Sequence, residues 1–389
     1  MKKVLGLIVI FTMLCSCKAV KEKEMDFETG VWLSYYELNS MLNSNDGFEK
    51  ELEKVINNCK KLKIQNLYIH TRAFGECIYK SDYFPQTENS KSYDYDILEY
   101  IINQCKSENL KVYAWINPYR ISSNTKNIDE ISKESPAYKW LRDETIENDI
   151  NVSFANGIYL NPSSSQVKVL IIDGIRELVA KYDVEGIHFD DYFYPTISED
   201  FDKLAFAEYK NKTANPLSLE DWRRMNVNSL ISGCYSAIKF ANKDMIFSIS
   251  PAADIDKNYT NLYADVGEWV KNGYVDEIIP QLYFGFEYPD SNFKFETLLQ
   301  KWKKLSKKNP NVNLKIGLAS YKADPELEAD KVEWESNSDI IARQVEICQK
   351  DKAISGCVLF SYSSVFSEKE AFKQQRINLL EYITGEQNE

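Results

Sequence analysis

The segment Glu185-Gly-Ile-His-Phe-Asp-Asp-Tyr-Phe-Tyr-Pro195 decides the fold. Its first half has the apolar alternation of a short β-strand, and that strand would end at two adjacent carboxylates, Asp190 and Asp191. Aromatic residues and a proline follow at once, which is typical of a loop. Such a strand is expected at the catalytic rim of a parallel β/α barrel, where acid and base groups meet a saccharide.

Similar apolar runs and intervening helical patterns recur along the chain. The predicted strands are residues 30–36, 64–70, 110–117, 184–190, 245–250, 277–283, 314–320 and 356–362. The predicted helices are residues 47–61, 94–108, 165–182, 222–242, 261–272, 293–308 and 339–350. This alternation predicts an α/β fold, a (β/α)8 barrel of the TIM type. A doubly wound open sheet is the alternative, but no Gly-rich phosphate loop follows the first strand, as its nucleotide-binding forms require.

Side-chain parity predicts which residues face the barrel axis, because alternate residues of a strand point to opposite sides. In the opening segment Ile187 and Phe189 would face the helices, which leaves His188 and Asp190 facing inward. The same rule, applied to three other strands, sends these residues inward or to the rim: Tyr68, His70, Arg72, Trp115, Asn117, Gln281 and Tyr283. Polar and aromatic side chains therefore converge on one end of the barrel.

Asp190 and Asp191 are the candidate catalytic residues. Asp190 faces inward by parity, whereas Asp191 joins it only if the strand has ended and the backbone turns. Glycoside hydrolysis needs a carboxylic acid that protonates the leaving oxygen and a carboxylate that attacks or activates water. A second carboxylate from another loop is the alternative partner, with Asp254 and Glu287 as candidates. The sequence does not distinguish a retaining from an inverting outcome.

We predict substrate contacts of three kinds, each with a packing role as its alternative. Bidentate contacts to an anionic substituent such as a lactyl carboxylate are assigned to Arg72 and Arg120. Contacts to hydroxyl or N-acetyl groups are assigned to Asn117 and Gln281. Stacking on sugar rings is assigned to Trp115, Tyr119, Tyr192 and Tyr283. Both histidines, His70 and His188, belong to the predicted rim. The long connection 117–160 is expected to wall one side of the cleft.

Composition excludes several other classes of protein. A net charge of -12 argues against nucleic acid as a partner. With only two histidines and no HxH pair, we predict no metal site and no cofactor. Six cysteines follow residue 17 without a CxxC pair, and their disulfide pairing is left open: Cys59, Cys77, Cys105, Cys234, Cys348 and Cys357.

The N-terminus predicts export. Lys2 and Lys3 precede an apolar run that is too short to span a bilayer, as in a secretory signal. Leu14-Cys-Ser-Cys17 has the form of a lipobox, so residues 1–17 are the predicted lipoprotein signal, with Cys17 lipidated. Cys15 is disfavoured because a leucine precedes it, and ordinary cleavage without a lipid is the alternative. Residues 18–27 form the predicted tether, and residues 28–385 a single catalytic domain.

The chain resembles the bacterial glycosyl-hydrolase-like family ten lipoproteins. The resemblance rests on motifs that occur in order along most of the mature chain: Gly30-Val-Trp-Leu, His70-Thr-Arg, Tyr79-Lys-Ser-Asp-Tyr-Phe-Pro85, Ala114-Trp-Ile-Asn-Pro-Tyr-Arg120, Tyr159-Leu-Asn-Pro162, Gly186 to Pro195, Ser250-Pro251 and Pro280-Gln-Leu-Tyr283. It implies a (β/α)8 catalytic domain, a place in the cell envelope and action on glycan chains, with peptidoglycan glycan as the leading substrate class.

We therefore expect a glycoside hydrolase of a cell-envelope or environmental glycan, bound to the membrane through its lipid anchor only and located at the outer membrane. The alternative is a non-catalytic glycan-binding envelope lipoprotein, which the retention of Asp190 and Asp191 disfavours. Substrate-assisted cleavage of the family 18 chitinase type is a minor variant, because no glutamate follows the aspartates before Tyr194-Pro195. The oligomeric state is left open.

Overall fold

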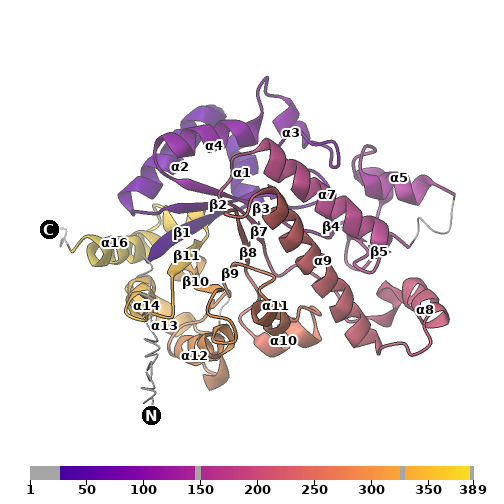
Figure 1. The fold of residues 1–389 in the computed structure, drawn as a ribbon. Helices are drawn as coiled ribbons and strands as arrows, with labels where there is room; N and C mark the ends of the chain where they lie inside the picture. Colours follow the sequence, from indigo (N-terminus) through magenta and orange to yellow (C-terminus); the bar gives the residue numbers. More distant parts are fainter. Residues whose placement is uncertain (1–26, 145–149, 325–328, 386–389) are drawn as a thin grey trace, which may run out of the picture.

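The structure, a computed structural model, describes residues 27–144, 150–324 and 329–385. Eight parallel strands close into a barrel in the order β1-β2-β3-β7-β8-β9-β10-β11, and β11 pairs with β1. Helices surround the barrel (Figure 1). The predicted (β/α)8 architecture is thus confirmed.

The barrel strands are β1 (Glu28–Leu33), β2 (Asn66–Arg72), β3 (Lys111–Ile116), β7 (Gly186–Phe189), β8 (Ile246–Ile249), β9 (Glu277–Ile278), β10 (Asn313–Ala319) and β11 (Gly356–Phe360). The helices are α1 (Tyr35–Leu42), α2 (Phe48–Lys61), α3 (Glu88–Lys91), α4 (Ile97–Ser107), α5 (Pro136–Arg142), α7 (Ser165–Lys181), α8 (Lys203–Lys212), α9 (Leu219–Ala241), α10 (Ile255–Thr260), α11 (Val266–Asn272), α12 (Phe295–Ser306), α13 (Lys331–Ser336), α14 (Ile340–Gln349), α15 (Tyr362–Val365) and α16 (Glu370–Thr384).

Each predicted strand run overlaps a barrel strand, with two instructive differences. The first strand ends at Leu33, because Ser34 starts α1 with a capping box in which its backbone N–H donates to the Glu37 carboxylate at 2.6 Å. The sixth strand is only two residues long. Pro280 follows it and has no N–H to donate to the ladder, so regular pairing stops there.

The predicted helices are present, but the structure also has helices that the sequence patterns did not predict: α1, α3, α5, α8, α10, α13, α15 and α16. Helix α16 is the last helix of the barrel, and it packs beside α14 through Gln375, whose side-chain oxygen accepts from the Ile341 N–H at 3.2 Å. Its apolar periodicity is weak, because only Gln375 and Leu379 are fully buried on it. A helix with so narrow a buried stripe gives little sequence signal.

The barrel interior is filled by aromatic residues, as the parity rule predicted. A separate inner cluster consists of Trp32, Tyr68, Tyr113, Trp115, Ile279 and Val358. The residues predicted to face the helices belong to the outer core, among them Ile187 and Phe189. Gly186 of the opening segment makes room for this filling, since a Cβ there would lie 2.8 Å from the Tyr113 ring.

Charged residues close the N-terminal end of the barrel. The Lys315 ammonium contacts Glu28 at 2.8 Å and Glu277 at 3.0 Å, and Lys111 contacts Glu28 at 2.9 Å. Burial alone would raise the pKa of Glu28, but Lys315 and Lys111 outweigh it and lower that pKa to about 2. The ion pairs tie four strands together at the end opposite the predicted site.

The 117–160 connection folds into a small antiparallel sheet beside the barrel. Its strands are β4 (Arg120–Ser122), β5 (Val152–Phe154) and β6 (Ile158–Leu160), in the order β4-β6-β5. The Leu160 N–H donates to the Tyr119 carbonyl at 2.8 Å, which fixes the sheet to the end of β3. This small sheet positions Arg120 at the C-terminal rim of the barrel.

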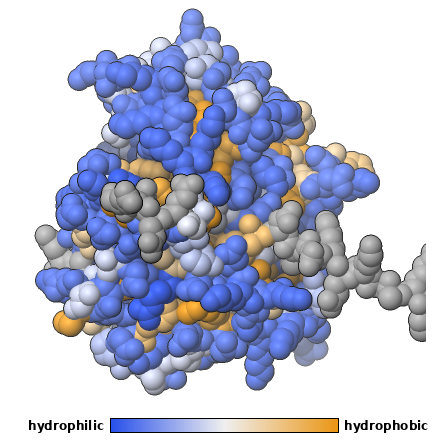
Figure 2. Space-filling model, turned by 90° about the vertical axis from the view of Figure 1, so that its left-hand side faces the viewer, coloured by the Kyte–Doolittle hydropathy of each residue, from blue (hydrophilic) through white to orange (hydrophobic). Residues whose placement is uncertain are grey.

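The outer surface is largely polar. On the face shown in Figure 2, hydrophobic side chains appear mostly in small groups and hollows between hydrophilic ones. Within the ranges that the structure describes, no helix is long and apolar enough to cross a membrane. Cys17, the predicted signal and nearly all of the predicted tether lie outside the described residues.

Candidate active site

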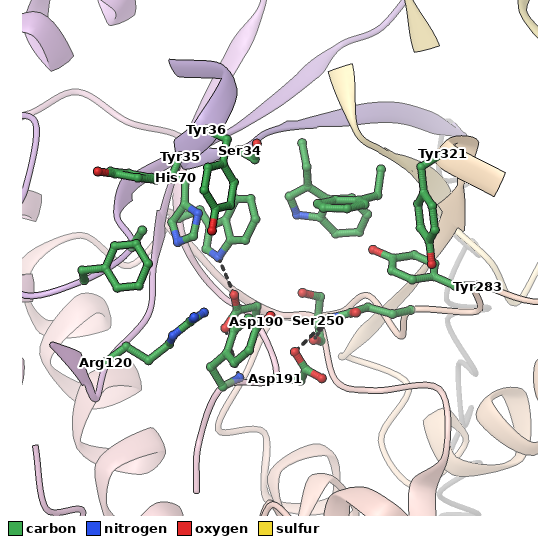
Figure 3. A pocket seen from close by; sticks show the side chains of 17 residues that line it. Ser34, Tyr35, Tyr36, His70, Arg120, Asp190, Asp191, Ser250, Tyr283 and Tyr321 are labelled. Atoms are coloured by element: carbon green, nitrogen blue, oxygen red, sulfur yellow. Dashed lines mark hydrogen bonds between the residues drawn. The ribbon is translucent and has the colours of Figure 1, made fainter. Parts of the chain in front are cut away.

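A cavity of about 350 Å³ opens at the C-terminal ends of the barrel strands (Figure 3). This central cavity is lined by Trp32, Ser34, Tyr35, Tyr36, His70, Ala73, Phe74, Trp115, Arg120, Asp190, Asp191, Tyr192, Ser250, Gln281, Tyr283, Tyr321 and Phe360. Of these described lining residues, only Asp190 and Asp191 carry a carboxylate. Its walls are mostly aromatic, which suits a ring-shaped substrate with apolar C–H faces.

Asp190 lies at the floor of the central cavity and is held from two directions. One carboxylate oxygen accepts a hydrogen bond from the Trp115 indole N–H at 3.0 Å, and the other accepts from the Tyr192 backbone N–H at 3.1 Å. The side chain is almost fully buried. These contacts fix the orientation of the carboxylate before any substrate binds.

Asp191 joins Asp190 in the cavity. Strand β7 ends at Phe189, so both aspartates follow the strand and the parity of the ladder no longer separates them. The Gln281 amide donates to Asp191 at 3.4 Å and to the Ser250 carbonyl at 3.0 Å, linking the ends of β7 and β8. The sequence analysis required that the strand end before Asp191 for it to join Asp190, and the structure meets this condition.

The two carboxylates influence each other's protonation. Burial raises the pKa of Asp190 well above its ordinary value, and the neighbouring Asp191 carboxylate raises it further, against the hydrogen bonds from Tyr192 and Trp115. Burial also raises the pKa of Asp191. Two close carboxyl groups resist losing both protons, so the pair titrates as a unit and retains one proton to higher pH than an isolated aspartate.

The aromatic walls are themselves ordered by stacking. His70 lies flat on the Trp115 indole, with ring centroids 3.7 Å apart and an interplanar angle of 3°. Tyr283 stacks on Phe360 at 5.8 Å on another side of the central cavity. Burial and the Arg120 guanidinium lower the pKa of His70 well below its ordinary value, so the ring is neutral and its Nε2 has no hydrogen-bond partner within the described chain.

The structure brings most of the predicted site residues together. The predicted residues that line the central cavity are Asp190, Asp191, His70, Trp115, Arg120, Tyr192, Gln281 and Tyr283. Four predicted substrate-binding residues do not line it: Arg72, Asn117, Tyr119 and His188. Each of these four is buried, and each has a local reason for its position.

Arg72 points away from the cavity because the ladder between β2 and β3 contains an irregularity. His70 pairs with Trp115, but Arg72 pairs with Ile116, so Thr71 is an extra residue in β2. One extra residue reverses the side to which the following side chains point. Arg72 consequently lies against the Phe84 ring, 4.1 Å from its centroid, rather than at the inner rim.

His188 lies beneath the cavity rather than in its wall. Its Nε2 accepts from the Trp32 indole N–H at 3.0 Å, and its Nδ1 contacts the Ser248 hydroxyl at 2.8 Å. Burial lowers the pKa of His188 to about 3, with Lys315 contributing. The ring is a neutral, hydrogen-bonded part of the barrel core, which was the alternative role that the sequence allowed.

Asn117 and Tyr119 support the rim from behind. The Asn117 amide donates to the Ala73 carbonyl at 3.2 Å, and Tyr119 is packed in the outer core. The alternative carboxylates also lie elsewhere: Asp254 caps α10 by accepting from the Asp256 N–H at 2.9 Å, and Glu287 pairs with Lys294 at 3.1 Å. Neither acid lines the central cavity.

Several cavity residues were not predicted. The ones with chemical interest are Trp32, Ser34, Tyr35, Tyr36, Phe74, Ser250, Tyr321 and Phe360. Most follow the C-terminal end of a barrel strand, so the parity rule, extended to β1, β8, β10 and β11, contains a signal for Trp32, Ser250 and Phe360. Tyr35 and Tyr36 are the first two residues of α1, and the sequence pattern had placed both in the first predicted strand.

The described residues do not form a metal site. No group of three or more His, Cys, Asp or Glu side chains in that part of the chain is arranged to hold a metal ion. The described cysteines, all six of those that follow residue 17, are buried as free thiols.

The amino-acid sequence is similar to a family of known proteins and to two named relatives. The family model of glycosyl hydrolase-like 10 matches residues 29–336. Glycosyl hydrolase YngK of Bacillus subtilis is 29% identical over 382 residues, covering 91% of this chain and 72% of YngK. Glycosyl hydrolase DigH of Escherichia coli is 25% identical over 413 residues, covering 91% of each chain.

A solved structure shares the fold. The glycoside hydrolase domain of PgaB (BpsB) from Bordetella bronchiseptica superposes with a TM-score of 0.60 at 14% identity, over 91% of this chain and 99% of that domain. The barrel, the cavity with its carboxylate pair and these relatives define the class of the protein as a glycoside hydrolase. Within that class, the chain belongs to the glycosyl hydrolase-like 10 family.

Proposed function

We propose that the protein hydrolyses glycosidic bonds in a cell-envelope glycan, with peptidoglycan glycan strands as the substrate and Asp190 and Asp191 as the acid/base pair. The observation that carries this proposal is the carboxylate pair, with Asp190 buried and Asp191 half-buried, in a cavity with aromatic walls. The names of YngK and DigH, both glycosyl hydrolases, support the reaction class.

The chemistry of the pair suits general acid catalysis. A retained proton on the pair is available for the leaving glycosidic oxygen, which must be protonated as the bond breaks. The remaining carboxylate is available to activate water or to stabilise positive charge at the anomeric carbon. The Trp115 and Tyr192 N–H groups hold Asp190 in one orientation, and Gln281 holds Asp191 in another.

The walls suit an amino-sugar chain. Trp115, Tyr192 and Tyr283 offer ring faces for stacking, while the unpartnered Nε2 of His70 and the Ser250 hydroxyl offer contacts to sugar hydroxyl or N-acetyl groups. The alternative function is a non-catalytic glycan-binding protein. A binding protein needs the aromatic walls, but it has no need for two adjacent carboxyl groups that oppose each other's ionisation.

We propose that the enzyme is a lipoprotein of the cell envelope, anchored through Cys17 at the outer membrane. The lipobox and the charged segment that follows it support this location. Labelling with an alkyne fatty acid, with the Cys17→Ala variant as the control, tests it. Incorporation into the wild type and not into the variant is expected; equal labelling or no labelling contradicts the anchor.

Digestion of purified peptidoglycan, with and without its stem peptides, tests the activity. We expect the wild type to release soluble fragments and Asp190→Asn and Asp191→Asn to lose at least about a hundredfold in rate. Asp244→Asn, an exposed aspartate before β8 at the other end of the barrel, is the matched control and should retain full activity. Binding to the glycan without release of fragments by the wild type would favour the binding protein instead. Mass and anomeric analysis of the fragments identifies the bond that is cut.

A further inference from the structure

A second cavity continues from the carboxylate pair to one side. It has a volume of about 260 Å³, and we call it the basic cavity. Its lining is Arg120, Asn156, Tyr159, Asp191, Tyr192, Phe193, Tyr194, Pro195, Lys257 and Leu262. Arg120, Asp191 and Tyr192 belong to both cavities. The two cavities therefore adjoin at one carboxylate of the pair.

The basic cavity contains two cations that form no salt bridge with a described residue. Neither Arg120 nor Lys257 forms an ion pair within the described ranges, although most other basic groups at the surface do. The Arg120 guanidinium lies between two rings, 4.0 Å from the Tyr192 centroid and 5.0 Å from the Phe74 centroid. These contacts hold the guanidinium in place, and a guanidinium can donate paired N–H groups to a planar anion such as a carboxylate.

The positive charge is a local exception in an acidic protein. The net charge is -12, yet the lining of the basic cavity carries Arg120 and Lys257 against the single carboxylate of Asp191. Both cations act electrostatically on Asp191, lowering its pKa against the effect of burial. Asn156 and the Tyr159 hydroxyl, which are 2.5 Å apart, add polar groups from the small sheet.

Another cavity that adjoins the central cavity has the opposite charge. A cavity of about 360 Å³ adjoins it through Tyr35, Tyr36 and Phe74 and contains Glu76 and Glu130, with no lysine or arginine in its lining. Burial raises the pKa of Glu76, and its acidic neighbours Glu88 and Glu134 raise it further against Lys91. An anionic sugar unit would be repelled in this acidic cavity and attracted in the basic cavity.

We propose that the basic cavity is a subsite for a sugar unit that carries a carboxylate, held by Arg120 and Lys257, and that this contact sets the direction in which the glycan lies across Asp190 and Asp191. The inference rests on the proposed function, which it makes more specific. Two kinds of unit have this chemistry: an amino sugar with a lactyl ether, as in peptidoglycan, and a uronic acid.

Calorimetry on the Asp190→Asn protein tests the subsite with three probes of equal length. The probes are a peptidoglycan tetrasaccharide with free lactyl carboxylates, its methyl ester, and a tetrasaccharide that alternates glucuronate with N-acetylglucosamine. We expect the free acid to bind about tenfold more tightly than the ester. Adding Lys257→Gln should weaken binding of the acid about two- to fivefold and leave the ester unchanged. Lys243→Gln, which removes an exposed charge at the other end of the barrel, is the control.

The outcomes separate this inference from the proposed function. If the glucuronate probe also depends on Lys257, the subsite accepts sugar carboxylates of both kinds; if it does not, the subsite is specific for the lactyl group. Equal binding of acid and ester, while the wild type digests glycan strands, overturns the subsite alone. An equal loss for acid and ester in Lys257→Gln overturns it as well. Absence of binding by all probes, together with absence of digestion, overturns both.

Discussion

Replacing Trp115 by phenylalanine tests how the protein controls the proton of its carboxylate pair. The indole N–H of Trp115 donates to one oxygen of Asp190 at 3.0 Å, and this contact favours the ionised form of the carboxyl group. A phenyl ring retains an aromatic face for His70 but cannot donate a hydrogen bond. We therefore expect Trp115→Phe to raise the pKa of Asp190 further.

The size of the change follows from the contact that is lost. A hydrogen bond to a buried charged group contributes about 1.5 to 3 kcal/mol, and one pKa unit corresponds to about 1.4 kcal/mol. The expected rise is therefore about one unit, and about two at most. If the pair must keep one proton to act as an acid, activity falls as pH rises through that pKa. The alkaline limb of the pH–rate profile should shift upward by the same amount.

The assay is the pH dependence of kcat on soluble glycan fragments, with an NMR titration of the aspartate carboxyl groups as a second readout. Trp334→Phe is the matched control, since Trp334 donates to the Asp330 carboxylate at 3.0 Å away from the central cavity. That control should leave the alkaline limb in place. An unchanged limb and an unchanged carboxyl titration in Trp115→Phe would refute this account of the proton.

Three further predictions concern stability and binding. The pKa of His188 is lowered to about 3 in the folded protein, so below pH 6.5 the unfolded chain binds a proton that the folded chain does not. The free energy of unfolding should therefore fall with decreasing pH, by up to about 1.4 kcal/mol per pH unit. Urea denaturation of wild type and His188→Gln between pH 6 and 4 measures this, and parallel pH dependences would contradict it. Gly186→Ala places a Cβ 2.5 Å from the Ile246 carbonyl oxygen and should lower the free energy of unfolding, measured by urea denaturation, by about 1 to 3 kcal/mol. An unchanged urea midpoint would show that β7 can shift to accept the methyl group without loss of stability. Tyr192→Ala removes a stacking face and should raise KM about tenfold while changing kcat less, whereas an equal fall in kcat would point to a role in chemistry.

Much of the fold could be predicted because barrel strands carry a strong local signal. Runs such as 184–190 are apolar and short, and alternation within them identified which side chains face inward. Helix α16 was missed for the complementary reason, since its burial depends on packing against α14 rather than on a broad apolar stripe. The capping box at Ser34 was the local signal that would have moved the end of β1.

The limits of parity explain which site residues were placed correctly. Asp190 and Gln281 follow strands without an inserted residue, so counting along the sequence gave their side correctly. Arg72 follows the extra residue Thr71, and nothing in a single sequence marks such an insertion. The basic cavity could not be predicted from the sequence for a different reason. It joins Arg120 on the small sheet to Lys257 on α10, and only the folded barrel brings them together.

The ion pairs at the base of the barrel also bear on how the chain acquires its structure. Glu28 begins β1, and its contact with Lys315 joins groups 287 residues apart in sequence. The barrel closes only when β1 pairs with β11, the last of its strands. Contacts between such distant residues slow folding, because a long loop must close before they form. During synthesis from the amino end, β1 therefore keeps one edge unpaired until β11, the last barrel strand, has been made, and an unpaired strand edge is a site of wrong pairing.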